Sequence, residues 1–277
     1  MTHAMRVIDF HTHPYRPDDL APATREFVHG ISQALREHGE QLRDARYFAQ
    51  ALRAQGVERA VVLPEHCPAT SGNVRTESVL EWCAQAPDTL IPFASVDPNS
   101  DADPAALLQT YITAGARGLK LYPSYQFYYP NERRVYPIYE VCQAAGIPVL
   151  MHIGSSVIKG TRIKYCDPIH LDDVAVDFPQ LSIVMAHGGR GFWYDVCAFL
   201  ASHFPNVYID VTGLVPERLL EYFPNLEKFA HKYLFGTDWP AMPKSAAHNV
   251  AAIRRLGLSE AALERIFWAN AAELLRI

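Results

Sequence analysis

Short apolar runs alternate along the chain with longer segments in which apolar and polar residues are spaced as in amphipathic helices. The short runs are rich in Val, Ile, Leu and Phe and lack polar alternation, which is typical of strands buried on both faces of a parallel sheet. We therefore predict eight strands, at residues 6–10, 59–63, 90–96, 118–122, 148–152, 182–186, 207–211 and 233–236.

Helices are predicted in the segments between these strands. In the first predicted helix, the apolar residues Val79, Leu80 and Cys83 are spaced with the 3.6-residue period of a helix. Gly146 supplies a stop signal for another helix, and Ser259 is a suitable N-cap for a last helix that runs to the C-terminus. Before that last helix, the predicted helices cover residues 73–86, 103–114, 135–145, 171–177, 194–203, 217–230 and 246–256.

Eight strand–helix steps with short connections predict a (β/α)8 TIM barrel, because parallel strands need crossover helices and eight such units close into a barrel. A doubly wound open sheet is the competing fold. The 277 residues contain no linker or low-complexity tract, so we expect one barrel domain over residues 1–277 that ends in the C-terminal helix. The longest irregular stretches, 122–134 and 154–168, are long enough to carry function.

Composition narrows the classes of partner. Hydrophobic residues make up 49% of the chain and charged residues 20%, which is ordinary for a globular protein. The 25 basic and 30 acidic side chains give a net charge of −5, which does not favour nucleic acid or anionic membranes. There is no signal-peptide pattern and no apolar run near the roughly 20 residues of a membrane span. We therefore expect a cytoplasmic protein with no nucleic-acid or membrane partner.

The cysteines give no sign of a disulfide framework or of a thiolate metal site. Their number is odd and no pair has C-x-x-C spacing, so we expect free thiols in a reducing compartment. The five residues are Cys67, Cys83, Cys142, Cys166 and Cys197.

Metal-binding side chains fall at the ends of predicted strands, where a TIM barrel places its active site. The first strand leads into His11 and His13, and residues i and i+2 of a strand point to the same side, so two imidazoles could chelate one ion. Taken alone, an H-x-H pair is a weak signal that an exposed turn explains equally well. The pair gains weight only from the residues found at the ends of other strands.

The same pattern recurs at three further strand ends. His152 ends the fifth strand, His187 follows the sixth, and Asp238 follows the eighth. Each has an ordinary explanation as a buried histidine or a helix cap, but their coincidence predicts one metal site. Imidazoles and a carboxylate without thiolates suit Zn²⁺, Mn²⁺ or Fe²⁺. Lys120, inside the apolar fourth strand, must reach the surface, form an ion pair or serve chemistry.

Five motifs follow one another along the chain: Ile8-Asp9-Phe10-His11-Thr12-His13, Gly118-Leu119-Lys120-Leu121-Tyr122-Pro123, Val149-Leu150-Met151-His152, Ala186-His187-Gly188-Gly189 and Phe235-Gly236-Thr237-Asp238-Trp239-Pro240. In this order they resemble the amidohydrolase superfamily, and most closely its amidohydrolase-related branch, also called amidohydrolase 2. The resemblance runs from residue 6 to residue 240. The last helix, with Asn270-Ala271, is also similar to the end of the family's chains.

The resemblance implies a TIM barrel of the metal-dependent hydrolase type that holds one divalent metal ion, with Zn²⁺ the first choice and Mn²⁺ or Fe²⁺ the alternatives. It places His187 beside the metal-bound water and Lys120 among the catalytic residues. In binuclear members a lysine at this position is carbamylated and bridges two ions, and the histidine of strand six then becomes a ligand. The implied ligands of a single ion are His11, His13, His152 and Asp238.

The implied activity is the hydrolysis of a small organic substrate, of carboxylic-acid, amide or lactone type, by metal-activated water. Asp238 would accept the proton of the water, while His187 would orient the water or stabilise the oxyanion. The same branch contains decarboxylases and hydratases, so a metal-dependent non-oxidative decarboxylase or other lyase is the alternative. A non-catalytic binding barrel would be favoured by a broken ligand set, and this set is intact.

The loops after strands four and five suggest the character of the small-molecule substrate. Arg162 and Lys164 lie there among aromatic residues, a combination that suits an organic acid or lactone because a guanidinium binds carboxylate bidentately. A role at the rim or in a homodimer interface explains the same residues equally well. Asp9 is expected either to support a metal ligand or to be structural, and His66 to be a solvated histidine. The aromatic residues are Tyr122, Tyr125, Phe127, Tyr128 and Tyr165.

Overall fold

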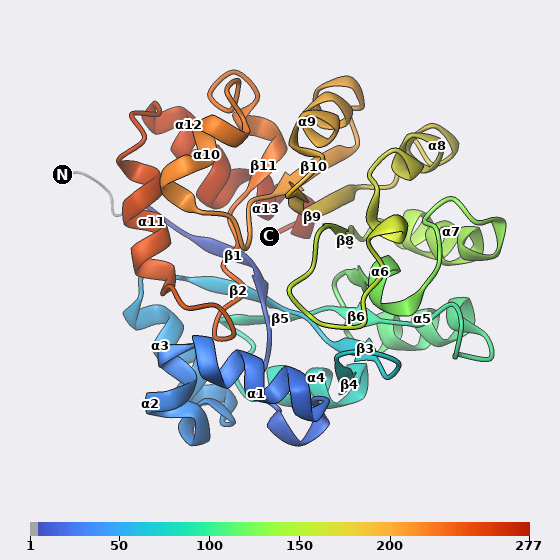
Figure 1. Ribbon diagram of the computed structural model, residues 1–277, viewed down its shortest axis with the longest axis horizontal. Coiled ribbons are helices and arrows are strands. Elements are labelled where there is room, and N and C mark those ends of the chain that lie inside the picture. Colours follow the sequence, from blue (N-terminus) through green and yellow to red (C-terminus); the bar gives the residue numbers. More distant parts are fainter. Residues whose placement is uncertain (1–4) are drawn as a thin grey trace.

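The computed structural model describes residues 5–277, and these form the predicted (β/α)8 barrel, with strands at the centre and helices around them (Figure 1). All the predicted strands are present, and they run parallel. The third is divided at Phe93, so its first half pairs with β2 and its second half with β7. In order they are β1 (Ile8–Thr12), β2 (Arg59–Val62), β5 (Leu90–Pro92) with β6 (Ala94–Ser95), β7 (Leu119–Leu121), β8 (Val149–Gly154), β9 (Ile183–Arg190), β10 (Val207–Asp210) and β11 (Tyr233–Leu234).

Backbone hydrogen bonds join the first and last strands and exclude the open-sheet alternative. The amide of Phe10 donates to the carbonyl of Phe235 at 2.8 Å, and the amide of Asp238 donates to the carbonyl of His11, also at 2.8 Å. Thr12 and Trp239 form a parallel bridge just beyond. The segment after β11 therefore lies directly beside the end of β1.

Most predicted helices are confirmed, with ends shifted by a few residues. Gly146 adopts a left-handed backbone conformation (φ 63°) and ends α7 as expected, and the Ser259 hydroxyl caps the C-terminal helix by accepting from the amide of Ala262 at 3.2 Å. The last helix is one run with a π-helical middle. These helices are α4 (Thr76–Cys83), α5 (Pro104–Thr113), α7 (Tyr136–Ala145), α8 (His170–Asp177), α9 (Tyr194–His203), α11 (Ala246–Arg254), α12 (Glu260–Glu264), η6 (Arg265–Ala269) and α13 (Asn270–Leu275).

Two helix predictions were wrong in part. The expected helix at 217–230 consists only of η4 (Pro216–Arg218) and α10 (Leu219–Tyr222), because Pro224 forces Phe223 out of the helical conformation. The start of the expected helix at 73–86 is instead a strand, β4 (Gly72–Val74), which pairs antiparallel with β3 (Glu65–Cys67). The loops at 122–134 and 154–168 contain short helical turns: α6 (Pro123–Gln126), η2 (Arg133–Val135) and η3 (Ile163–Cys166). A further turn, η5 (Ala230–Lys232), precedes β11.

The chain between β1 and β2 is helical, which the sequence pattern did not predict. It forms η1 (Pro17–Asp19), α1 (Pro22–Ile31), α2 (Gln33–Leu42) and α3 (Ala45–Ala54). Ser32 links α1 to α2: its hydroxyl accepts from the amide of Leu35 at 3.1 Å and donates to the carbonyl of Pro240 at 2.6 Å. This bond fixes the α1–α2 junction to the loop after β11.

The core has two layers, as expected for a barrel. In the interior of the barrel, Ile8, Phe10 and Phe93 form a buried cluster, and side chains of α13 belong to the same cluster. A larger cluster fills the space between the strands and the surrounding helices. The amino ends of the strands are thus closed by α13, which leaves the carboxyl ends for a cavity.

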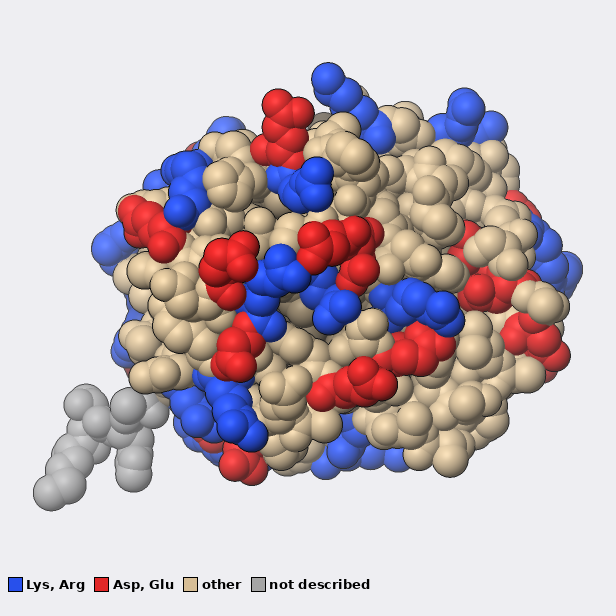
Figure 2. All heavy atoms as spheres, turned by 90° about the horizontal axis from the view of Figure 1, so that it is seen from below, with Lys and Arg blue, Asp and Glu red and all other residues tan. Residues whose placement is uncertain are grey.

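The distribution of surface charge and the state of the cysteines are those expected from the composition. Figure 2 shows acidic and basic side chains interspersed on the face seen from below, and ion pairs such as Arg43–Asp18 and Arg75–Glu77 combine the two signs. The five cysteines are all buried and unpaired, as expected. Within residues 5–277 no helix has both the length and the apolar character needed to cross a bilayer.

Candidate metal and active site

A β-bulge directs the histidines of β1 toward the cavity at the carboxyl ends of the strands. Asp9 pairs with Ala60 and Thr12 with Val62, so β1 contains one extra residue over this interval. Such a bulge changes the face to which the following side chains point. Phe10 therefore packs inside the barrel, and its neighbour His11 lines the cavity together with His13.

Hydrogen bonds define which nitrogen of each imidazole faces the cavity. Nδ1 of His11 lies 2.6 Å from Oδ2 of Asp210, and Nδ1 of His13 lies 3.2 Å from the carbonyl oxygen of Leu63. Carboxylate and carbonyl oxygens accept, so we assign the proton of each ring to Nδ1. The Nε2 lone pairs of His11 and His13 are then free to bind an ion.

His187 and His152 form a second pair, which is linked by a chain of hydrogen bonds. Nδ1 of His187 donates to the carbonyl of Thr212 at 2.9 Å, which leaves its Nε2 as an acceptor. That Nε2 lies 3.1 Å from Nδ1 of His152, so Nδ1 of His152 is the donor. This chain of hydrogen bonds ends at Nε2 of His152, which is buried and has no hydrogen-bond partner among the described residues.

The backbone conformation of His187 determines where its side chain points. Its φ of 66° lies in the left-handed region, which non-glycine residues seldom adopt. Ala186 points into the barrel, and regular strand alternation would turn the next side chain toward the helices. The left-handed turn brings His187 to the cavity instead. Gly189 follows this turn and approaches the next segment closely, since a β-carbon there would lie 2.5 Å from the carbonyl oxygen of Trp193.

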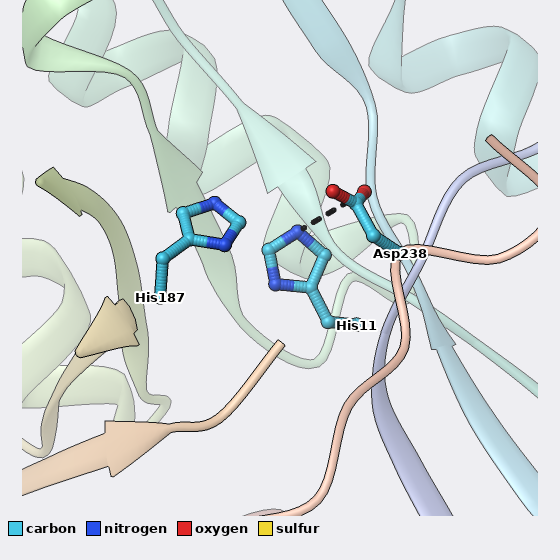
Figure 3. A group of neighbouring side chains, drawn as sticks. All are labelled: His11, His187 and Asp238. Atoms are coloured by element: carbon cyan, nitrogen blue, oxygen red, sulfur yellow. Dashed lines mark ion pairs between the residues drawn. The ribbon is translucent and has the colours of Figure 1, made fainter. Parts of the chain in front are cut away.

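Asp238 completes the cluster from the segment after β11. Its backbone is also left-handed, with φ 63°. Oδ1 of Asp238 lies 3.3 Å from Nε2 of His13 and 3.8 Å from Nε2 of His11. Figure 3 shows His11, His187 and Asp238 pointing toward one another, and one possible ligand atom from each lies within 4.8 Å of the others.

Burial keeps His11, His152 and His187 neutral, which is the form that binds metal ions. Burial and the nearby Lys120 lower the pKa of His11 to about 4, and the same two causes hold the pKa of His152 well below its usual range. Burial likewise lowers the pKa of His187. For Asp238, burial favours the acid form, but the close approach of His13 and the positive charge of Lys120 outweigh it and lower the pKa.

Lys120 contributes the cation of the site. It is fully buried, and its Nζ has no hydrogen-bond partner among the described residues. Nζ lies 4.9 Å from the centre of the Tyr122 ring. Burial lowers the pKa of Lys120 to about 8, against the opposing effect of the Asp210 and Asp238 charges. The lysine does not reach the surface, and it forms no ion pair with the acidic residues that the structure describes.

These residues fit a divalent cation. Buried polar atoms in proteins are nearly always paired, and an ion bound at Nε2 of His152 would satisfy that atom. The imidazole and carboxylate donors are those that Zn²⁺, Mn²⁺ and Fe²⁺ accept. The hydrogen bond from His11 to Asp210 is also the kind of support that metal-binding histidines commonly have.

All the predicted site residues line one cavity of about 90 Å³, namely His11, His13, Lys120, His152, His187 and Asp238. Tyr122 and Tyr125 also line it, whereas Arg162, Lys164 and Tyr165 do not. Arg190 lines the cavity in their place, with Nε and Nη2 donating to the carbonyl of Ser155 at 3.2 and 2.7 Å.

Three polar residues near the site have roles that the sequence left open or missed. Asp9 contacts both ends of the site: its Oδ1 accepts from the amide of His11 at 3.1 Å, and its Oδ2 accepts from the Thr237 hydroxyl at 2.5 Å, which ties β1 to the segment that carries Asp238. His66 does not line the cavity, and it is bound by Asn73 and Asp101 rather than solvated. Asp210 was not predicted. Its position at the end of β10 follows the same strand-end rule that identified the histidines.

Comparisons with known proteins agree with this geometry. A family model described as amidohydrolase matches residues 8–277. A comparison with curated proteins gives no significant match. Among solved structures, an uncharacterised TIM-barrel protein from Bordetella bronchiseptica superposes with a TM-score of 0.83 and 25% identity, covering 98% of this chain and 99% of that one.

Two more distant structures carry named activities. A probable 2-pyrone-4,6-dicarboxylic acid hydrolase from Acinetobacter baumannii, with citric acid bound, has a TM-score of 0.67 and 16% identity over 99% of this chain and 100% of that one. A 5-carboxyvanillate decarboxylase from Novosphingobium aromaticivorans, with bound manganese, has a TM-score of 0.70 and 15% identity over 100% and 98%. From the family match, the chain belongs to the amidohydrolase-related branch of the amidohydrolase superfamily, a family of enzymes.

Proposed function

We propose that this protein is a metal-dependent hydrolase of small carboxylic-acid, lactone or amide substrates. The observation that carries the proposal is the position of the Asp238 carboxylate, within 4 Å of two imidazole nitrogens that face the same cavity. A carboxylate placed in this way can bind an ion with one oxygen and accept a proton with the other. Hydrolysis by activated water needs both functions at one point.

His11, His13, His152 and Asp238 would hold the ion, with Zn²⁺ the first candidate. When bound, the ion would lower the pKa of water toward neutrality and polarise the substrate carbonyl. The positive charge of Lys120 favours the ionised form of Asp238, so Asp238 can take the proton of the attacking water and return it to the leaving group. His187 orients His152 through the hydrogen bond between their rings.

Two cations favour an acidic or carbonyl-bearing substrate. The Lys120 ammonium lies at the cavity wall, has no hydrogen-bond partner among residues 5–277, and can stabilise negative charge on a substrate oxygen. Arg190 is held by backbone carbonyls and forms no ion pair with the described acidic residues, so its charge is available to a substrate carboxylate. A small organic acid or lactone would satisfy both.

The competing proposal is a decarboxylase or another lyase, and Lys120 is the observation that favours it. Such enzymes must deliver a proton to carbon, and an unpartnered ammonium with a pKa of about 8 can donate one. Parallel assays on one preparation separate the two. Hydrolysis of lactones and amides without CO2 release supports the hydrolase, whereas CO2 release from aromatic acids without hydrolysis overturns it.

Metal counting tests the ligand set. We expect one ion per chain in the purified protein, and much less in His11→Ala and His152→Ala. His203→Ala, at an exposed histidine of α9, is the matched control and should keep the full equivalent. Full occupancy in His152→Ala together with loss in His187→Ala would transfer the ligand role to His187. Two ions per chain would instead indicate a binuclear site that includes Lys120.

A further inference from the structure

The cavity has an apolar half that the proposed chemistry does not use. Its wall on this side comes from the helices between β1 and β2 and includes Leu20, Phe27, Val28, Ile31 and Leu35. Phe27, Val28 and Ile31 are spaced so that they lie on one face of α1. We call these five residues the α1 wall. No charged side chain of this segment lines the cavity.

Two further apolar residues line the cavity from other segments of the chain. Met242, after β11, and Val157, after β8, line the same cavity. Ile31 and Met242 are half-buried and belong to none of the core clusters formed by residues 5–277, and Val157 is 52% exposed. Their apolar surface therefore faces the cavity and its mouth rather than the protein core. Covering such surface with a hydrocarbon group removes it from water and is favourable.

The charged side chains that line the cavity are Glu65, Lys120, Arg190 and Asp238, and none of them belongs to the α1 wall. Lys120 and Arg190 belong to β7 and β9, Glu65 belongs to β3, and Asp238 follows β11, so none of the four comes from the helices between β1 and β2. The cavity is thus divided into a charged end, which includes the histidines, and an apolar end at α1. Ser32, bound to the carbonyl of Pro240 at 2.6 Å, fixes α1 relative to the charged end.

We propose that the α1 wall binds an uncharged hydrocarbon tail of the substrate, so that the enzyme acts on amphipathic acids, lactones or amides. The carbonyl or carboxylate head lies at the histidines and Lys120, and the tail extends along α1 toward Val157. This substrate class rests on the proposed function, but binding of the tail is a property of the cavity that can be measured without turnover.

The test is calorimetric binding of unbranched carboxylates, from acetate to octanoate, to the metal-loaded protein. We expect the affinity to rise about fourfold for each added methylene until the apolar half is filled, as for transfer of hydrocarbon out of water. Dicarboxylates of matched length place a charge against the α1 wall and should not show this rise. An affinity that does not change with chain length would overturn the proposal.

Variants locate the binding surface. Ile31→Asn and Met242→Gln should flatten the chain-length dependence, because each makes the wall polar at a residue outside the core clusters. Ile31→Val should retain it, and Ile31→Trp should fill the space and lower the affinity for octanoate while sparing that for acetate. His29→Asn, on the exposed face of the same helix, is the control and should bind like the wild type. An undiminished dependence in both polar variants would place the tail elsewhere.

The same experiment separates the two proposals. Chain-length-dependent binding without hydrolysis of any lactone or amide would retain the apolar site and refute the hydrolase. Hydrolysis at rates that do not depend on the length of the tail would support the hydrolase and refute the apolar site.

Discussion

Asp210→Asn is the substitution that most directly tests the assignment of the His11 ring. In the wild type, Oδ1 of Asp210 accepts from the amide of Thr212 at 2.9 Å and from its hydroxyl, while Oδ2 accepts from Nδ1 of His11 at 2.6 Å. With asparagine, the oxygen would keep the two Thr212 bonds, and the amide nitrogen would face His11. The side-chain amide and Nδ1–H of His11 are both donors and cannot form a hydrogen bond with each other. The tautomer of His11 with the proton on Nε2 would therefore be favoured.

The expected consequence is a loss of metal affinity with retention of the fold. A protonated Nε2 has no lone pair, so the ion loses one ligand or must force the ring back against the side-chain amide introduced at position 210. Substitutions of groups that orient metal-binding histidines typically weaken binding 10- to 100-fold. This corresponds to about 1.4–2.8 kcal/mol. The packing around residue 210 changes little because aspartate and asparagine have the same shape.

The assay is competition with a chelator of known affinity, measured for wild type and Asp210→Asn at one pH. Nitrogen NMR of the histidine rings gives an independent signal, since it reports which nitrogen of His11 carries the proton. Asp97→Asn is a matched control, because Asp97 is a buried loop carboxylate that does not line the cavity and accepts from Asn99 and Ser100. Unchanged metal affinity in Asp210→Asn, with His11 still protonated at Nδ1, would refute the reasoning.

Four further outcomes can be checked. Asp238→Asn should remain folded but lose about 10²- to 10⁴-fold in turnover as the base is removed, and near-normal kcat would contradict its role. His152→Ala should lower metal affinity, and it should also lower the melting temperature of the metal-free protein, because the donor to Nε2 of His187 and a buried ring are lost; unchanged metal affinity by chelator competition would remove His152 from the ligand set. Gly236→Ala should weaken metal binding, because its β-carbon would overlap the Thr212 hydroxyl and lie 2.5 Å from Oδ1 of Asp210; wild-type affinity by chelator competition would show that the site can adjust. Burial lowers the pKa of Lys232 to about 8, so between pH 8 and about 10 the unfolded chain binds more protons there and the free energy of unfolding should rise with pH; denaturant titrations of Lys232→Met should show less of this rise.

The barrel and the location of the site were predictable because both depend on regular features of the sequence. Each strand is a short apolar run, and such a run predicts a strand without knowledge of the neighbouring strands. In a parallel barrel all carboxyl ends meet at one rim, so residues that follow different strands must converge. This rule places His11, His152, His187 and Asp238 at the same rim, but it does not determine where each side chain points.

Departures from regular structure were not predictable in the same way. His11 directly follows an interior residue, Phe10, and His187 directly follows another, Ala186. Strict alternation would have turned both histidines away from the cavity, and only the bulge in β1 and the left-handed backbone at residue 187 bring them back. Both devices depend on contacts with neighbouring segments, such as the close approach of Trp193 to Gly189.

The helices between β1 and β2 separate the choice of substrate from the chemistry. The proposed ligand atoms lie on β1, just after β1, on β8 and in the segment after β11, all held by the barrel, whereas the apolar wall is provided by α1 and the residues that flank it. The link between the two is the bond from the Ser32 hydroxyl to the carbonyl of Pro240, two residues after Asp238. Changes at Ile31 can therefore alter which tail fits without moving a ligand. Removal of the Ser32 hydroxyl, by contrast, should affect tail binding and turnover together, because it frees the wall and leaves a buried carbonyl near Asp238 unpaired.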